Sequence, residues 1–259
     1  MKTRPTLEHW TTSITLIRPN EIIYRGIPID EVIEQWSFPA TVWLLLMGTP
    51  PDAGQEDAVR RALVAACDHG LAAPSIAAAR TCASTRGAPG VALAAGLLAF
   101  AGPAHGGAAG ECAKVLEEIG EALGDELEND AVVESIVRAR LDAGKRIPGY
   151  GHPYHQADPR VPGLMRAPLA SDRFRRIAAA VERALVAIKG PRLHMNADSA
   201  VAAMLADAGL DFSAIDLITS IGRCVGLAAH VHEEIENELP FRAPSLAAVE
   251  YVGPAGGRE

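Results

Sequence analysis

The sequence predicts a mainly α-helical protein, on three observations. Of its 259 residues, 49% are hydrophobic but only 5% are aromatic. The core must therefore be built from Ala, Leu, Val and Ile, with few of the aromatic residues that strands favour. From residue 30 onward, apolar residues recur almost throughout at the spacing of a helix face. High apolar content and well-mixed charge exclude disorder, and the length suits one large domain or two modest ones.

The first fifty residues predict one hairpin and one short helix. Residues 1–13 have no apolar segment, so we expect no secretory signal and a cytoplasmic location. Residues 13–25 hold two short apolar runs around a Pro-Asn pair, which predicts a β-hairpin. Residues 41–48 predict a short buried helix that ends at Gly48, because the following Pro-Pro pair cannot continue it.

Helical patterns fill most of the remaining chain. The segment 87–110 has the length of a membrane span, but its glycines and prolines favour a buried helix followed by a tight loop, so we expect no membrane contact. Ser213 and Asp216 match a capping box at the start of the last helix. Residues 144–165 are irregular and rich in Gly, Pro and His, and such long loops are often functional. The other predicted helices cover about 55–67, 73–85, 90–101, 112–123, 133–141 and 174–188.

Charge and cysteine content narrow the function classes. Twenty-four basic residues against 32 acidic ones give a net charge of −8, with no basic stripe, so we expect no nucleic-acid partner. The four cysteines are scattered without paired spacing. They are typical of small core residues in a reducing compartment.

Four sites carry the chemistry. Glycines on both sides of His105 let the backbone approach a ligand, although a lone loop histidine in solvent is the more frequent case. His152 follows a bent Gly-Tyr-Gly segment among basic residues, which suits an anionic ligand or simply an exposed basic loop. Asp198 lies where a helix begins, so an N-cap or a first-turn acid is its plainer interpretation. His69 is the fourth, in the segment DHGLAAPS.

Taken together, these segments resemble the citrate synthase superfamily, which includes citryl-CoA lyases and the lyase module of ATP-citrate lyases. The resemblance implies a mainly α fold with the active site in a cleft between two helical domains. The large domain would comprise residues 1–106 with 213–259, and the small domain residues 107–212. The segments that carry the resemblance are YRG, DHGLAAPSIAAARTCAST, GPAHGGA, PGYGH with DPR, NAD and GRCVGLAAHVHEEIENELPFRAP.

The same resemblance implies a role for each site residue. Asp198 would remove the α-proton of the acyl-CoA, and His105 would hydrogen-bond the thioester oxygen. His152 would act on the oxaloacetate carbonyl as acid, or on the citryl hydroxyl as base. No metal and no covalently bound cofactor are expected, since the CoA thioester is a substrate. The dicarboxylate would be held by His69, Arg160, Arg223 and Arg242, and CoA by Lys145, Arg146, Pro148, Gly149, Tyr150 and Gly151.

Arg242 is implied to reach the site of a neighbouring subunit, so a homodimer or higher homo-oligomer with a shared site is expected. The chain also departs from synthases. Pro153 stands where many synthases carry Arg, and Ser199 stands where synthases usually carry Phe. The spacing from His152 to Arg160 is one residue shorter than the usual synthase spacing. A long helical block found in full synthases is also missing between residues 51 and 68.

The missing block favours citryl-CoA lyase chemistry, which yields acetyl-CoA and oxaloacetate, and lyase-type members also lack the Phe. Citrate synthase, a 2-methylcitrate-type synthase and a non-catalytic CoA-binding homologue remain alternatives. A metal-dependent hydrolase is disfavoured, because residues two apart on a helix do not share a face. The residues that prompt that last alternative are His230, His232, Glu233 and Glu234.

Overall fold

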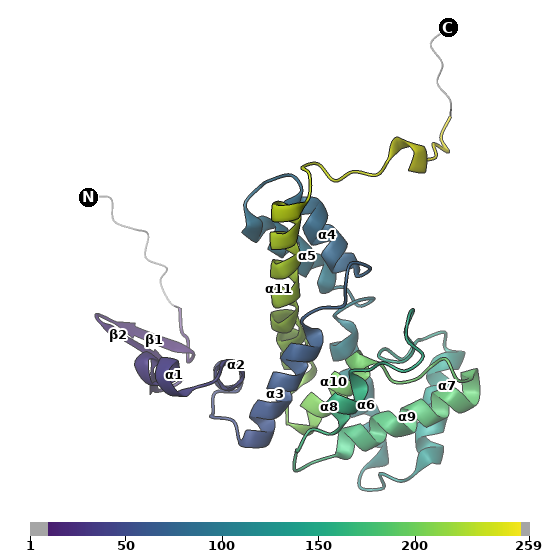
Figure 1. Cartoon of the computed structure of the whole chain (residues 1–259). Helices are drawn as coiled ribbons and strands as arrows, with labels where there is room; N and C mark the ends of the chain where they lie inside the picture. The colour runs from purple at the N-terminus through teal and green to yellow at the C-terminus, as the bar shows by residue number, and fades with distance from the viewer. Residues whose placement is uncertain (1–9, 255–259) are drawn as a thin grey trace.

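The computed structural model describes residues 10–254. Most of the residues from which we predicted the absence of a secretory signal lie outside that range. The two outer ends of the predicted large domain also lie outside it. The fold is mainly helical, as predicted, with strands only near the N-terminus of the described chain (Figure 1).

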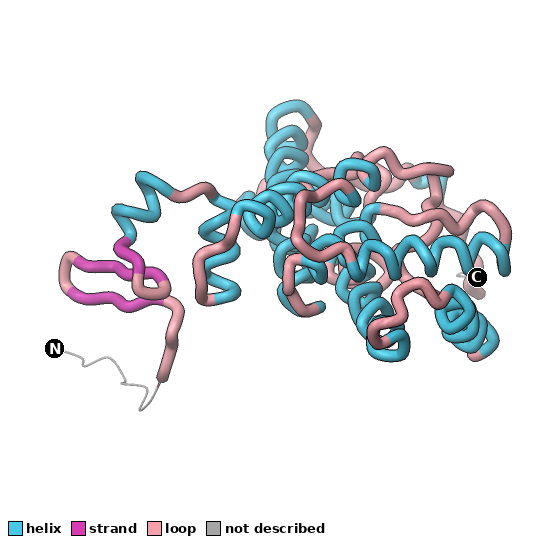
Figure 2. The backbone as a smooth tube through the Cα atoms, turned by 90° about the horizontal axis from the view of Figure 1, so that it is seen from below, coloured by secondary structure: helices cyan, strands magenta, loops and turns pink. Residues whose placement is uncertain are grey.

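The predicted hairpin is confirmed. β1 (Thr15–Arg18) pairs antiparallel with β2 (Glu21–Tyr24), and Asn20 turns the chain with a φ of 62°. A third strand, β3 (Ile27–Pro28), extends the sheet beyond the prediction. α1 (Ile29–Gln35) and α2 (Phe38–Met47) follow, and α2 ends at Gly48 as predicted, with a φ of 84°. Figure 2 shows the sheet set apart from the helical body.

The first helices of the body pack around one long helix. α3 (Ala53–Ala66) begins with a capping box, and both α4 (Pro74–Ala83) and α5 (Pro89–Phe100) begin with proline. α11 (Phe212–Asn237) contacts α3, α4, α5 and α6. By length and composition alone α11 could cross a membrane, the one such helix within residues 10–254. Its contacts are those of a central core helix.

The second half forms a compact helical group. It contains α6 (Ala108–Leu123), α7 (Asp130–Asp142), α9 (Arg173–Lys189) and α10 (Ala197–Asp207). α8 (Val161–Met165) corrects the expectation of an irregular segment up to residue 165. Its proline lies in the first turn, where no intrahelical N–H is needed. The described chain closes with a 3₁₀ turn at Leu246–Ala248.

The predicted capping box at residues 213 and 216 is wrong. α11 is capped by Asp211, whose carboxylate accepts the N–H of Ala214 at 2.8 Å. The Ser213 hydroxyl donates to that same carboxylate. Asp216 instead accepts the N–H of Gly110 at 2.9 Å, so it caps the first turn of α6 from a neighbouring helix. A sequence pattern cannot distinguish these two capping partners.

Two hydrophobic clusters meet on α11. The larger joins α2 and α3 to the helices of the second half, and the smaller joins α4 and α5 to the C-terminal part of α11. α11 therefore links the two groups of helices. The division into domains at residues 106 and 212 stays a prediction. The smaller cluster consists of Ala73, Ile76, Ala79, Ala83, Ala92, Leu227 and Val231.

Candidate active site

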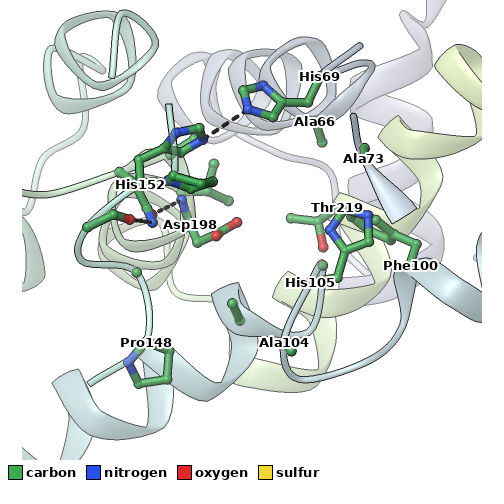
Figure 3. Close-up of a pocket in the computed structure, with 18 of the residues that line it drawn as sticks. Ala66, His69, Ala73, Phe100, Ala104, His105, Pro148, His152, Asp198 and Thr219 are labelled. Carbon is green, nitrogen blue, oxygen red and sulfur yellow. Dashed lines mark hydrogen bonds between the residues drawn. The ribbon is translucent and has the colours of Figure 1, made fainter. Parts of the chain in front are cut away.

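A cavity of about 820 Å³ lies where the two groups of helices meet (Figure 3). Residues far apart in the sequence line it, from the ends of α3 and α5, the starts of α4 and α10 and the first half of α11. The structure brings most of the predicted site residues to this cavity and leaves Lys145 and Arg242 outside its lining. Those that line it are His69, His105, Arg146, Pro148, Gly149, Tyr150, Gly151, His152, Arg160, Asp198 and Arg223.

His105 lies in the tight loop between α5 and α6. Its Nε2 lies 2.8 Å from the hydroxyl of Ser75, and its ring packs edge-on against Phe100. Gly106 has no room for a side chain, because a Cβ there would lie 2.2 Å from the Phe100 ring. Burial lowers the pKa of His105, and Arg223 and His69 lower it further, so its ring is neutral at neutral pH.

Asp198 lies in the first turn of α10, across the cavity from His105 (Figure 3). The N-cap of that helix is Asn196, whose side-chain oxygen accepts the N–H of Asp198 at 2.9 Å, so Asp198 is a first-turn acid and not the cap. Burial is the largest influence on Asp198 and raises its pKa to about 6, against the opposing effect of Arg160 and Arg223. A carboxyl group with that pKa can both release and accept a proton near neutral pH.

The Gly-Tyr-Gly segment is fixed against the start of α10. Gly151 donates its N–H to the carbonyl of His194, and Asn196 bonds the carbonyls of both Gly149 and Gly151. Gly149 has a φ of +84°, and a Cβ on it would lie 2.6 Å from Ser199. The buried Ser199 thus leaves no room for a side chain on Gly149.

His69 and His152 face each other with their Nε2 atoms 2.9 Å apart. His152 accepts the backbone N–H groups of Tyr154 and His155 on Nδ1, both at 3.1 Å. Burial is the largest cause that lowers the pKa of each of the two rings. His155, which the sequence interpretation did not single out, stacks on His152 with centroids 4.5 Å apart.

Two of the arginines that line the cavity, Arg160 and Arg223, differ in how many of their nitrogens have hydrogen-bond partners. Arg223 is only 4% exposed, and its Nε and Nη1 atoms have no hydrogen-bond partner. Its guanidinium lies over the Phe100 ring, and its nearest acid, Asp68, is 4.0 Å away. Arg160 instead binds Asp158 through Nε and Nη2, at 3.0 and 2.7 Å.

Asp158 is a second residue that sequence reasoning did not assign. It accepts the N–H of Ala197 at 3.0 Å as well as both nitrogens of Arg160, which joins the loop to the start of α10. Burial raises its pKa, but these hydrogen bonds outweigh burial and bring it to about 2. The Asp-Pro-Arg motif was the available signal, although only its arginine was interpreted.

Arg242 lies outside the cavity. Its guanidinium binds the carboxylate of Glu234 at 2.9 and 2.8 Å, and its backbone N–H donates to the hydroxyl of Ser84. Glu234 is fully buried and also binds Arg80. This network excludes Glu234 as a metal ligand, and His232 is exposed, which disfavours the metal-hydrolase alternative.

His69, His152 and His155 present ring nitrogens within 4.8 Å of one another, a spacing that could hold a metal ion. The chemistry of the donors does not fit. Nδ1 of His152 already accepts two N–H groups, which keeps the proton of that ring on Nε2. Neither nitrogen of His152 is then a free ligand atom.

Residues 47–243 match the sequence profile of the family described as "Citrate synthase, C-terminal domain". The chain belongs to the citrate synthase family. Among solved structures, it superimposes on citryl-CoA lyase from Hydrogenobacter thermophilus with a TM-score of 0.85 and 35% identity, over 96% of each chain. ATP citrate lyase from Methanothrix soehngenii, at 21% identity and a TM-score of 0.82, shares the fold over 98% of this chain and 43% of its own.

Citrate synthase 2 of Bacillus subtilis is 28% identical over 239 residues, which is 90% of this chain and 60% of that protein. The chain thus spans about three fifths of the length of the curated relatives it matches first. These matches confirm the predicted family and fold.

Proposed function

We propose that this member of the citrate synthase family cleaves citryl-CoA into acetyl-CoA and oxaloacetate, and catalyses the reverse condensation. The observation that carries the proposal is the placement of Asp198 and His105 on opposite sides of one cavity. A thioester α-proton is a very weak acid, so a carboxylate removes it only where the developing oxyanion is stabilised at once. His105 supplies that stabilisation, because Ser75 fixes its ring through Nε2 and leaves Nδ1 for a ligand.

The unsatisfied arginine supports an anionic substrate. Two buried nitrogens of Arg223 lack partners, and a buried donor without a partner is costly. A carboxylate of oxaloacetate or of the citryl group would satisfy both with a bidentate pair. The main chain of residues 148–151 would hold CoA on the same side of the cavity as Asp198.

Lyase chemistry is favoured over synthase chemistry by the match to citryl-CoA lyase, which covers nearly the whole of both chains. Citrate synthase is the second candidate, since curated relatives carry that name. Incubating purified protein with citryl-CoA separates the two. Acetyl-CoA with oxaloacetate supports the lyase, whereas citrate with free CoA overturns it in favour of the synthase.

We also propose that two copies of the chain pair. Large apolar side chains are exposed on the N-terminal sheet and on the C-terminal segment, among them Ile17, Leu239 and Phe241. Arg242, implied to serve a neighbouring site, lies in that same segment. Light scattering tests the pairing. Activity regained on mixing Arg242→Ala with Asp198→Ala, once mixed dimers are shown to form, supports a shared site, and no recovery contradicts it.

A further inference from the structure

The hydrogen bond between His69 and His152 determines where the protons of both rings lie. Their Nε2 atoms are 2.9 Å apart, so one nitrogen must carry a proton and the other must offer a lone pair. Which ring is the donor depends on what binds the other nitrogen of each imidazole.

The turn that follows His152 decides the question. Nδ1 of His152 accepts the N–H groups of Tyr154 and His155, and a nitrogen that accepts two N–H groups cannot carry a proton itself. The proton of His152 is therefore on Nε2, and the doubly protonated ring is excluded. Pro153 has no N–H and a fixed φ, which favours the turn that directs the next two amides at the ring. His69 Nε2 is then the acceptor, and its proton is on Nδ1.

We propose that His69 is the general base for the hydroxyl proton of the substrate, and that His152 is a fixed hydrogen-bond donor to the same oxygen. This inference rests on the proposed lyase function and divides between two histidines a role first implied for His152 alone. The substrate oxygen replaces the direct contact between the rings. It then accepts the N–H of His152 and donates its own proton to His69.

The proton and electron balance closes without a further reactant. In cleavage, His69 Nε2 takes the hydroxyl proton as the carbon–carbon bond breaks, and the alkoxide oxygen becomes the ketone of oxaloacetate. The bonding pair passes to the thioester enolate, whose oxygen is held by His105. Protonated Asp198 then gives its proton to the α-carbon, which completes acetyl-CoA. Condensation is the reverse.

The surroundings of His69 keep its lone pair available. Burial is the largest cause that lowers its pKa, and Arg160 and His155 lower it further, against the opposing effect of Asp158. Arg223 on α11 acts in the same direction as Arg160. His69 is thus neutral at neutral pH and can accept a proton.

The tautomers are tested on the unliganded, full chain by ¹⁵N NMR of the imidazole nitrogens at neutral pH. His69→Gln and His152→Gln assign the signals. We expect a protonated Nε2 and an unprotonated Nδ1 in His152, and the opposite pattern in His69. A proton on Nδ1 of His152, or on Nε2 of His69, overturns the proposal. This spectrum decides the tautomers even if the chain does not cleave citryl-CoA.

The roles are tested by the pH profile of citryl-CoA cleavage. His69→Gln removes the base, so we expect kcat to fall about 10²–10⁴-fold. In the wild type, protonation of His69 lowers the activity at low pH. We expect this acidic limb of the pH profile to be absent from His69→Gln. His152→Gln keeps an N–H donor, so we expect kcat to fall only about tenfold and the acidic limb of the pH profile to remain. His232→Gln, on the exposed face of α11, is the control and keeps full activity. The reverse pattern, with the limb lost only in His152→Gln, contradicts the assignment.

Discussion

The two walls of the cavity differ in how their polar groups are satisfied. On one wall, His152, Asp158 and the Gly-Tyr-Gly loop are held by hydrogen bonds within the chain. On the other, Arg223 is buried with nitrogens that lack partners. Asp198 begins α10 on the first wall, but burial, with no hydrogen bond to its carboxylate among the described residues, raises its pKa. The satisfied wall positions groups, and the unsatisfied groups are those left for substrate. Substitution of a satisfied positioning group such as Asp158 should therefore act mainly on stability, and substitution of Asp198 or Arg223 mainly on activity.

The largest effect is expected at Asp198. Asp198→Asn removes the proposed acid for the α-carbon, so we expect cleavage of citryl-CoA to fall about 10³-fold. Its raised pKa means that the folded state holds the proton more tightly than the unfolded chain, so folding loses stability as pH rises through about 6. The variant avoids this loss of about 3 kcal/mol. Thermal unfolding should show Asp198→Asn to be more stable than the wild type at pH 7.5 and equally stable at pH 3.5. A variant less stable than the wild type at pH 7.5 would contradict the view that burial of the Asp198 carboxylate costs stability.

Arg223 should give the next largest effect. Arg223→Met removes the proposed bidentate partner of a substrate carboxylate, so we expect KM for oxaloacetate in the condensation direction to rise about 10²-fold. The same change removes two buried donors without partners, which should stabilise the unliganded chain by about 1–3 kcal/mol. Thermal shifts with and without oxaloacetate measure both. A fall in the melting temperature of the free protein would show that Arg223 is satisfied in solution.

Asp158 tests the satisfied wall. Its pKa of about 2 lies below that of Asp in the unfolded chain, so its carboxylate stabilises the fold at every pH above the ordinary Asp pKa. This contribution is lost as the pH falls towards 2. Asp158→Asn should lower the free energy of unfolding at pH 7 by about 2 kcal/mol. The difference from the wild type should vanish near pH 2, as acid-unfolding curves would show. Equal stability at pH 7 would mean that this wall is not held as described.

Ser75 should give the smallest effect. Ser75→Ala leaves His105 in place but removes the hydroxyl that fixes its ring, so we expect kcat to fall about tenfold, since one neutral hydrogen bond is lost. KM for oxaloacetate should not change, because the proposed role of His105, which Ser75 contacts, is on the thioester oxygen. Steady-state kinetics separates the two parameters. Thr85→Ala is a control, since its exposed hydroxyl bonds only Cys82 of the same helix end.

The sequence predicted the helical fold, the hairpin and the loop that bears His152. Periodicity and turn residues are local, so these elements could be predicted from the chain alone. The N-cap of α11 could not be predicted, because Asp211 and Asp216 are both suitable capping acids. Only the packing of α11 against α6 places Asp216 where it accepts the N–H of Gly110. β3 was missed for the same reason, since it depends on pairing with β2.

Within the site, motifs identified the residues but not their partners. Asp158 and Ser75 act on Arg160 and His105 from positions whose significance appears only when the chain is folded. The proton positions of His69 and His152 likewise depend on two backbone amides that no side-chain motif records. Pro153, a departure from the synthase pattern, is explained by the turn that presents those amides.

The most direct test of the account is cleavage of citryl-CoA in D₂O, with the acetyl-CoA product examined by mass spectrometry. If Asp198 protonates the α-carbon, its exchangeable proton is replaced by deuterium, and each acetyl group formed should carry one deuterium. Asp198→Asn should form almost none of this product. Citrate and free CoA as the products, or the same deuterated acetyl-CoA at an unchanged rate from Asp198→Asn, would contradict the account.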